Sequence, residues 1–235
     1  MDTNGPAPLT TYDDLAKMID HSLLRPELTD EQVIEGCRVA RDYNVASVTV
    51  RPFDVDLAVR AMEGSDVPVG SVAGFPHGSQ NTATKLYETR DLIRRGAREI
   101  DMVIAIGKLL SRQFQYAEME IEQMARACHE AGAILKVIFE NAYLTDELKI
   151  IACRICSRAG ADFVKTSTGF APTGATLEDL RLMRAHADPA VRVKAAGGVR
   201  TLEKALEVHG VGCARFGATA TVAILEDWKK RLSAS

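Results

Sequence analysis

The sequence predicts a single (β/α)₈ TIM barrel, in which eight parallel strands close into a ring surrounded by helices. The first observation is a repeated unit: a short apolar run, a break rich in Gly, Pro or Thr, and an amphipathic stretch. The second is the spacing of the apolar runs, whose centres lie about 20–35 residues apart, the length of one βα unit. The third is that no linker interrupts the 235 residues, a normal length for one such barrel.

Eight apolar runs are candidates for the strands. Most are rich in Val, Ile and Ala without a regular alternation, as in strands that are buried on both faces of a parallel sheet. A doubly wound open sheet is the structural alternative, because it also alternates strands with helices. The expected strands lie within residues 17–22, 47–52, 69–76, 99–107, 134–140, 162–168, 191–198 and 213–219.

Helix signals fall between these runs. The segment from Thr29 to Gln32 has the pattern of a capping box, in which each side chain accepts a hydrogen bond at the start of a helix. Thr145, Thr176 and Thr201 each precede an amphipathic run and are candidate N-caps. Several of these runs end at glycine, which suits the C-terminal cap of a helix.

The domain organisation is expected to be simple. Residues 1–10 are polar and contain proline, so they are expected to form a flexible N-terminal tail. Residues 11–235 are expected to form a single TIM-barrel domain. Within it, residues 11–18 predict a short helical segment that covers the bottom of the barrel.

Composition excludes several classes of protein. Apolar residues make up 46% of the chain and charged residues 26%, which indicates a large core under an ordinary surface. A formal net charge of −3 argues against non-specific binding of nucleic acid. No apolar run reaches the roughly 20 residues of a membrane span, so no membrane association is expected.

The five cysteines favour a cytoplasmic location, because an odd number in a chain of this size does not fit a disulfide framework. Cys153 and Cys156 form a C-x-x-C pattern, which could indicate zinc or redox chemistry. They lie in a run with helical periodicity, and no second pair exists. We interpret them as small residues on a buried helix face.

Three expected strands carry a lysine within an apolar run, namely Lys136, Lys165 and Lys194, and a fourth carries Asp101. Lysine is rarely buried without a partner, and four charges on consecutive inner strands would converge on one small volume. This pattern fits an amine that must be neutral to attack a carbonyl. Two cations about 5 Å apart repel enough to lower a lysine pKa by about two units, and burial lowers it further.

Schiff-base catalysis needs such a neutral amine and a nearby group that carries protons. Lys165 is followed by Thr-Ser-Thr-Gly, which leaves room for a substrate, and Lys194 could supply the neighbouring charge. Spacing alone leaves the roles of Lys165 and Lys194 open.

A second group of residues predicts a phosphate site. Gly197 and Gly198 follow the seventh expected strand, and Gly217 and Thr219 follow the eighth, where barrels of this class usually bind phosphate. Arg200 could add a positive charge. The five histidines show no metal-binding spacing, and no nucleotide-binding motif occurs, so neither a metal nor an organic cofactor is expected.

At the level of motifs the chain resembles the deoxyribose-phosphate aldolase family. The matching segments are IDHSLLRPELTDEQV, VAGFPHG, EIDMVIAIGKL, LKVIFENAYL, DFVKTSTGF, VKAAGGVRT and RFGAT, which run in order from about residue 15 to 222. The resemblance implies reversible cleavage of 2-deoxy-D-ribose 5-phosphate to D-glyceraldehyde 3-phosphate and acetaldehyde. It also implies a homo-oligomer, either a dimer or a tetramer.

The resemblance also implies a role for individual residues. The lysine of the VKTSTGF motif, Lys165 here, forms the Schiff base; Lys194 perturbs its pKa, and Asp101 takes part in a proton relay. The same resemblance implies that Asp20, Thr166 and Lys136 support the substrate or the relay. It implies that the phosphate is held by Gly169, Gly197, Gly198, Gly217 and Thr219. The chain departs from the family pattern at Thr49, Ala105 and Ala220, and it lacks a C-terminal tyrosine.

Two rival functions stay open from the residues alone. A sugar-phosphate isomerase or another Schiff-base aldolase would fit the barrel and its glycine loops. A binding protein without catalytic activity on a retained barrel is the other class. The presence of Lys165, Lys194 and Asp101 argues against that second class.

Overall fold

The computed structural model describes residues 6–234, and within them eight parallel strands form a closed barrel in the order β1 to β8. Each strand pairs with its neighbours in the chain, and β1 pairs with β8 to close the ring. This confirms the predicted barrel and excludes the open sheet. The strands are β1 Ile19–Leu23, β2 Ser47–Val50, β3 Val69–Ala73, β4 Glu99–Val103, β5 Ile134–Ile138, β6 Phe163–Lys165, β7 Arg192–Ala195 and β8 Arg215–Ala218.

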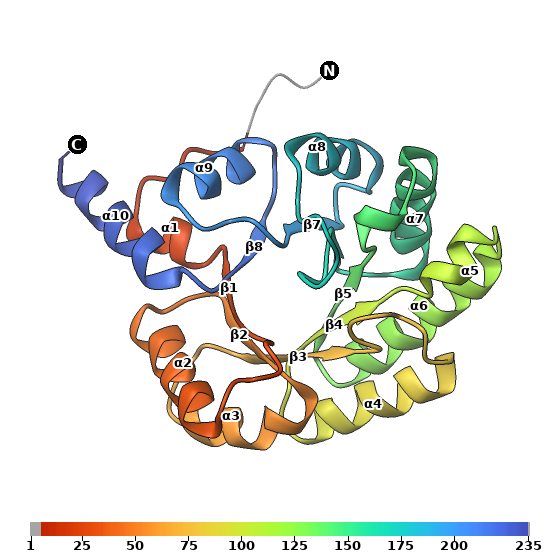
Figure 1. Ribbon diagram of the computed structural model, residues 1–235, viewed down its shortest axis with the longest axis horizontal. Coiled ribbons are helices and arrows are strands. Elements are labelled where there is room, and N and C mark those ends of the chain that lie inside the picture. The colour runs from red at the N-terminus through yellow and green to blue at the C-terminus, as the bar shows by residue number, and fades with distance from the viewer. Residues whose placement is uncertain (1–5, 235) are drawn as a thin grey trace.

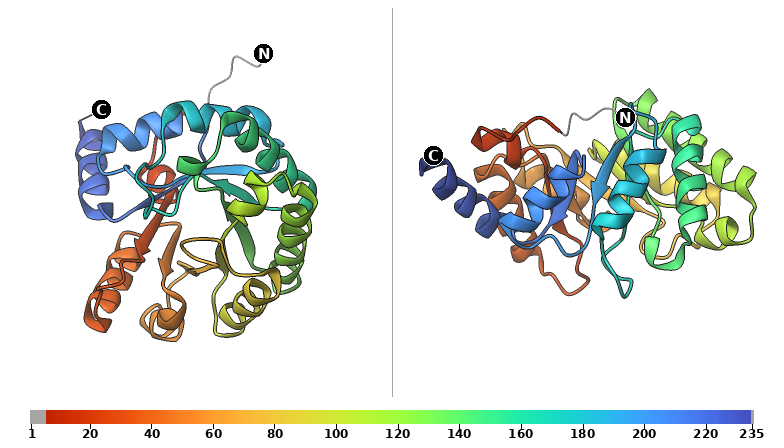
Figure 2. Two further views of the ribbon diagram at one scale, coloured as in Figure 1. Left: turned by 45° about the vertical axis from the view of Figure 1, so that its right-hand side comes forward. Right: turned by 90° about the horizontal axis from the view of Figure 1, so that it is seen from above.

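Helices surround the strands, as Figure 1 and both views of Figure 2 show. Each segment between consecutive strands contains at least one helix, which is the connection that parallel strands require. The described helices are α1 Tyr12–Ala16, α2 Asp30–Asp42, α3 Val55–Ala61, α4 Thr82–Arg94, α5 Ile106–Leu110, α6 Phe114–Glu130, α7 Asp146–Ala159, α8 Leu177–His186, α9 Leu202–Gly210 and α10 Thr221–Ser233, with short 3₁₀ turns η1 Pro52–Asp54 and η2 Asn141–Tyr143.

The predicted helix caps are present. The Thr29 side chain accepts a hydrogen bond from the Gln32 backbone, and the Gln32 side chain accepts one from the Thr29 backbone, which completes the capping box of α2. Thr145, Thr176 and Thr201 are the N-caps of α7, α8 and α9. These bonds satisfy backbone N–H groups that the first turn of a helix leaves unpaired.

The short N-terminal helix α1 is confirmed. It directly precedes β1 and therefore lies at the amino-terminal end of the barrel, packed beside α10 (Figure 1). The Trp228 indole N–H donates to the Thr11 carbonyl at 3.0 Å and ties α10 to the cap of α1. In the preceding segment, Leu9 packs against the core. Flexibility of residues 1–10 stays a prediction, and residues 1–5 lie outside the described part of the chain.

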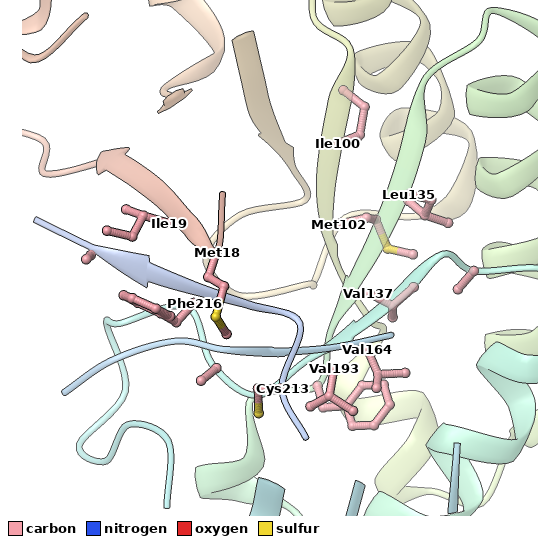
Figure 3. Packing of buried hydrophobic residues seen from close by; sticks show 14 of the residues in the cluster. Met18, Ile19, Ile100, Met102, Leu135, Val137, Val164, Val193, Cys213 and Phe216 are labelled. Atoms are coloured by element: carbon pink, nitrogen blue, oxygen red, sulfur yellow. The ribbon is translucent and has the colours of Figure 1, made fainter. Parts of the chain in front are cut away.

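The strands separate apolar from charged side chains. Apolar residues of the strands belong to a buried cluster shared with the helices; Figure 3 shows some of its members, among them Ile19, Met102, Val137 and Val193. Successive side chains of a strand point to opposite faces. The strand residues that alternate with these apolar residues therefore point into the barrel. That interior is charged, whereas barrels usually fill it with Val, Ile and Leu.

The C-x-x-C pattern lies on a buried part of α7, as interpreted from the sequence. Cys153 and Cys156 are both buried and free. Burial raises the pKa of the Cys153 thiol to about 12, so this side chain is a neutral thiol near pH 7. Within residues 6–234, no cluster of His, Cys, Asp and Glu could hold a metal ion, and no helix is long and apolar enough to cross a bilayer.

Candidate active site

Asp101 lies at the centre of the charged interior. Its Oδ2 accepts hydrogen bonds from the Lys165 and Lys194 ammonium groups, both at 2.7 Å, and its Oδ1 accepts one from Lys136 at 3.0 Å. The three lysines are brought here by the parallel register of β5, β6 and β7, in which Lys165 pairs directly with Lys194. The four residues that the sequence singled out are therefore in direct contact.

Asp20 enters the same cluster from β1. Its Oδ2 forms ion pairs with Lys194 and, at 3.1 Å, with Lys136. Its Oδ1 accepts from the Ser47 hydroxyl at 2.8 Å and from Arg215 Nε at 2.7 Å. Every oxygen of this fully buried carboxylate thus has partners, which is the condition for keeping a charge in the interior.

Burial is the main cause of a low pKa at Lys165. The pKa of this lysine, 3% exposed, falls from 10.5 to about 8. Burial contributes most to this change, Lys194 and Lys136 also lower the pKa, and Asp101 opposes the change. The expectation that a neighbouring lysine acts on Lys165 is consistent with this, but desolvation is the larger effect. Free amine is therefore available near neutral pH.

Asp101 is held in its charged form. Burial raises the pKa of a carboxyl group, but Lys136, Lys165 and Lys194 together outweigh it and hold the pKa of Asp101 far below its usual range. Conversely, Asp101, Asp20 and Glu99 outweigh the burial of Lys136 and raise the pKa of that lysine. Lys136 thus stays protonated, and Asp101 stays ionised.

A cavity of about 500 Å³ opens above Lys165 at the carboxyl ends of the strands. The loops after β6, β7 and β8 supply much of its wall. Of the residues expected to bind phosphate, all five line this cavity: Gly169, Gly197, Gly198, Gly217 and Thr219. Arg200 lines it too, and so does Arg25 from the loop after β1, a cation that the sequence reasoning missed. Lys165 and the glycine-containing loops therefore face the same cavity.

The comparisons with known proteins agree with this geometry. A family model of DeoC/LacD family aldolases matches residues 15–226. The chain belongs to this family. It is similar to a deoxyribose-phosphate aldolase of Caldanaerobacter subterraneus subsp. tengcongensis, with 47% identity over 218 residues, 92% of this chain and 94% of that relative.

Solved structures support the same membership. A putative deoxyribose-phosphate aldolase from Coccidioides immitis superposes with a TM-score of 0.90 at 37% identity, covering 95% of this chain and 88% of that one. A tetrameric deoxyribose phosphate aldolase from Aeropyrum pernix gives a TM-score of 0.87 at 32% identity, covering 95% and 94%. The resemblance drawn from the motifs is therefore confirmed, and the protein is an aldolase of this family.

In this family member, three of the residues expected to bind substrate do not line the cavity. Asp20 and Lys136 are buried in the ion-pair cluster of the barrel interior, where Lys136 contacts both Asp20 and Asp101. Thr166 is buried, and its hydroxyl donates to the Ala196 carbonyl at 3.2 Å and accepts from the Ala196 N–H at 3.0 Å, tying the ends of β6 and β7 together. Their positions suit support of the catalytic groups, not contact with a ligand.

The sequence reasoning missed Glu99 and Arg215. Arg215 donates to Asp20 and, through Nη2, to both Glu99 oxygens, and Glu99 accepts from Lys136 at 2.5 Å. A signal was present, because each lies two residues before a residue already assigned to the site, Asp101 or Gly217. Residues two apart on a strand share a face.

A further residue that the sequence reasoning missed, Glu140, holds the loop after β6. Glu140 adopts a left-handed backbone conformation, with φ of 55°, and its carboxylate accepts from both the N–H and the hydroxyl of Thr168. The next residues, Gly169 and Phe170, line the cavity. Glu140 thus fixes the loop that carries part of the cavity wall.

His21 on β1 and His77 in the loop after β3 have different settings. His21 is buried, its Nδ1 lies 2.8 Å from the Thr221 hydroxyl at the start of α10, and burial lowers its pKa to about 4. It neighbours the inward-facing Asp20 and so points to the opposite face of β1. His77 is exposed. Neither lines the cavity at Lys165.

Proposed function

We propose that the protein is a Schiff-base, class I aldolase that reversibly cleaves 2-deoxy-D-ribose 5-phosphate to D-glyceraldehyde 3-phosphate and acetaldehyde. One observation carries the proposal: a buried lysine of lowered pKa shares a carboxylate with a second lysine and faces a cavity walled by glycine loops. Family membership and the names of the relatives support the choice of substrate.

Lys165 is the nucleophile in this proposal. Its free amine attacks the C1 aldehyde of the open-chain sugar, and loss of water from the resulting carbinolamine gives a protonated imine. Removal of the proton from the C3 hydroxyl then turns C3 into a carbonyl and breaks the C2–C3 bond. The electrons of that bond form a C1–C2 double bond, and the imine π electrons move onto nitrogen. Glyceraldehyde 3-phosphate leaves, and the two remaining carbons stay on Lys165 as an enamine.

Asp101 and Lys194 handle the protons. Asp101 Oδ2 contacts both ammonium groups at 2.7 Å, so a proton can pass between the lysines through this oxygen. Protonation of the enamine carbon regenerates the imine, and water then releases acetaldehyde and the free Lys165 amine. A positioned acid or base of this kind contributes about 10²–10⁴-fold to a rate.

The cavity wall binds the phosphate. Backbone N–H groups of glycine-rich turns form concave sites for anions. Arg25 and Arg200 add charge at the mouth, where both line the cavity. The residues we assign to phosphate are Gly169, Gly197, Gly198, Gly217 and Thr219. Asp20, Lys136 and Thr166 are assigned to support of the catalytic groups, because they contact these groups or the strand ends that carry them.

The test of the function is cleavage of 2-deoxyribose 5-phosphate by the purified protein, followed through both products. Lys165→Met should lose about 1,000-fold or more of kcat/KM, because no other group can form the imine. Lys149→Met is the matched control, since Lys149 is a buried lysine of α7 that pairs with Asp179. Absence of cleavage by the wild type, or equal activity of Lys165→Met, would contradict the proposal.

Two further expectations accompany this function. We propose that the chain forms a homodimer or homotetramer, supported by a tetrameric relative, and light scattering of the purified protein measures this. A cytoplasmic location stays a prediction, consistent with five free, buried cysteines among the described residues.

A further inference from the structure

A second layer of charge lies in the barrel beneath the catalytic groups. It consists of Arg215 on β8 and Glu99 on β4, neither of which lines the cavity. Arg215 Nη2 donates to the two oxygens of Glu99 at 3.0 and 2.9 Å, and its Nε donates to Asp20 at 2.7 Å. One planar guanidinium thus holds carboxylates of two strands in a fixed geometry.

This pair reaches Asp101 by two routes. On one side, Arg215 donates to Asp20, which pairs with Lys194, and Lys194 donates to Asp101. On the other side, Glu99 accepts from Lys136, which also donates to Asp101. All links are direct contacts between side chains that are almost fully buried. Both routes end on the carboxylate that binds Lys165.

The interior holds one more base than acid. Among the described residues, the strands contribute four basic groups and three acidic groups to this cluster, so the charges balance when one base is neutral. A net charge in the buried interior of a barrel raises its free energy. The excess of one base therefore favours loss of a proton from one of the basic groups. The groups around Lys165 are Asp20 from β1, Glu99 and Asp101 from β4, Lys136 from β5, Lys194 from β7 and Arg215 from β8, with Arg25, Glu27 and Arg200 at the cavity mouth.

We propose that Arg215 and Glu99 are positioning residues that set the charge balance of the barrel interior and thereby the pH range in which Lys165 is a free amine. They act through Asp20 and Lys136, not by contact with substrate. This inference rests on the proposed function, in which Lys165 must be neutral to react. It assigns a role to two charges that the chemical steps themselves do not use.

The two residues have opposite effects on Lys165. Arg215→Met removes a cation, so protonated Lys165 becomes more favourable and its titration moves to higher pH. Glu99→Gln removes an anion and keeps the shape of the side chain, so the titration moves to lower pH. One charge at the distances of this cluster corresponds to a shift of about one pH unit in each direction.

The double variant Arg215→Met/Glu99→Gln restores the balance. It leaves three bases and two acids in the cluster, an excess of one base as in the wild type. Its Lys165 titration should therefore return to within about 0.3 pH units of the wild type, although both single variants move. Loss of packing or general destabilisation cannot produce shifts of opposite sign that cancel in the pair.

The measurement is competitive acetylation of Lys165 by acetic anhydride between pH 5 and 10, read by mass analysis of its peptide. This reports the free amine directly and does not depend on the substrate. The pH profile of kcat/KM for cleavage is the second readout. If the wild type does not cleave the substrate, but acetylation of Lys165 shifts in opposite directions in Arg215→Met and Glu99→Gln, only the proposed function is overturned.

Control variants keep the inference falsifiable. Glu120→Gln removes another fully buried carboxylate, which pairs with Lys85 between α4 and α6 and lies outside the barrel interior. It should not shift the titration of Lys165. Arg215→Lys keeps the charge and should leave the titration in place, while kcat falls because an ammonium lacks the planar fork.

If Arg215→Met fails to fold by circular dichroism, Glu99→Gln and Arg215→Lys decide the matter. A downward shift in Glu99→Gln together with an unmoved titration in Arg215→Lys supports the inference. Shifts of the same sign in the two single charge-removing variants, or no shift in Glu99→Gln, would overturn it.

Discussion

The chemistry of this aldolase is concentrated in the environment of one amine. An exposed lysine has a pKa near 10.4 and is almost entirely protonated at neutral pH. At Lys165, burial and two neighbouring lysines lower the pKa to about 8, although Asp101 favours the cation. Asp101 therefore lowers the fraction of Lys165 that is free amine, and in the proposed mechanism it supplies the path for protons.

In the proposed mechanism Lys194 contributes charge as well as a proton path. Lys194→Met removes the cation that shares Asp101 Oδ2 with Lys165. The pKa of Lys165 should rise, so the limb of the kcat/KM profile that increases with pH should move to higher pH. The maximal rate should fall by about 10²–10⁴-fold, because a proton carrier is lost.

The check is a pH profile of cleavage between pH 6 and 10. Lys204→Met, which removes a half-exposed lysine paired with Glu207, is the control and should match the wild type. A lower maximal rate with an unmoved or lower titration would show that Lys194 acts only as a proton carrier.

At the scale of residues, the sequence predicted the charged cluster but not the separate roles of its lysines or its full membership. Three lysines and Asp101 were identified because charge in an apolar strand is unusual. The choice of Lys165 over Lys194 came from the family resemblance, since two neighbouring lysines look alike from spacing. Glu99 and Arg215 were missed because their partners lie on strands whose pairing a linear sequence does not display.

At the level of elements, the loops after β6 and β7 approach one another closely. A Cβ atom added to Gly174 would lie 2.6 Å from the Gly197 carbonyl oxygen and 2.7 Å from its carbonyl carbon. Real Cβ atoms do not approach backbone so closely, and backbone cannot move aside like the end of a side chain. The absence of a side chain at Gly174 thus allows the Gly197 loop to take its place in the cavity wall.

Gly174→Ala should therefore damage substrate binding more than imine chemistry. We expect KM for 2-deoxyribose 5-phosphate to rise about tenfold, a loss of about 1.4 kcal/mol, because the phosphate loop shifts. Imine formation with acetaldehyde, which carries no phosphate, should change much less. Gly210→Ala is the matched control, because a Cβ there meets nothing within 4 Å. Equal losses for both substrates would contradict the assignment of this loop to phosphate.

The elements themselves were largely predictable, apart from their ends. Apolar runs, capping threonines and glycine stops placed all eight strands and most helices. The run 99–107 was expected to be one strand, but β4 ends at Val103 and α5 begins at Ile106. A strand that passes directly into a short, partly buried helix leaves a continuous apolar run, and periodicity cannot divide it.

For the whole molecule, closure of the barrel creates the site. The pairing of β1 with β8 brings Asp20 within 2.7 Å of Arg215, although 195 residues separate them in the chain. An open sheet would place these strands apart and leave both charges unpaired. The sequence predicted the closed barrel from its repeated units, but the contacts that closure makes could be read only from the folded chain.

The central claim, that Lys165 is the Schiff-base nucleophile, is tested most directly by trapping. The protein is incubated with acetaldehyde and sodium borohydride, digested, and each lysine-containing peptide is weighed by mass spectrometry. We predict a stable ethyl group on Lys165 of the wild type, and no such adduct on the interior lysines of Lys165→Met. An ethyl group on Lys194 or Lys136 in place of Lys165, or no adduct at all, would contradict the account.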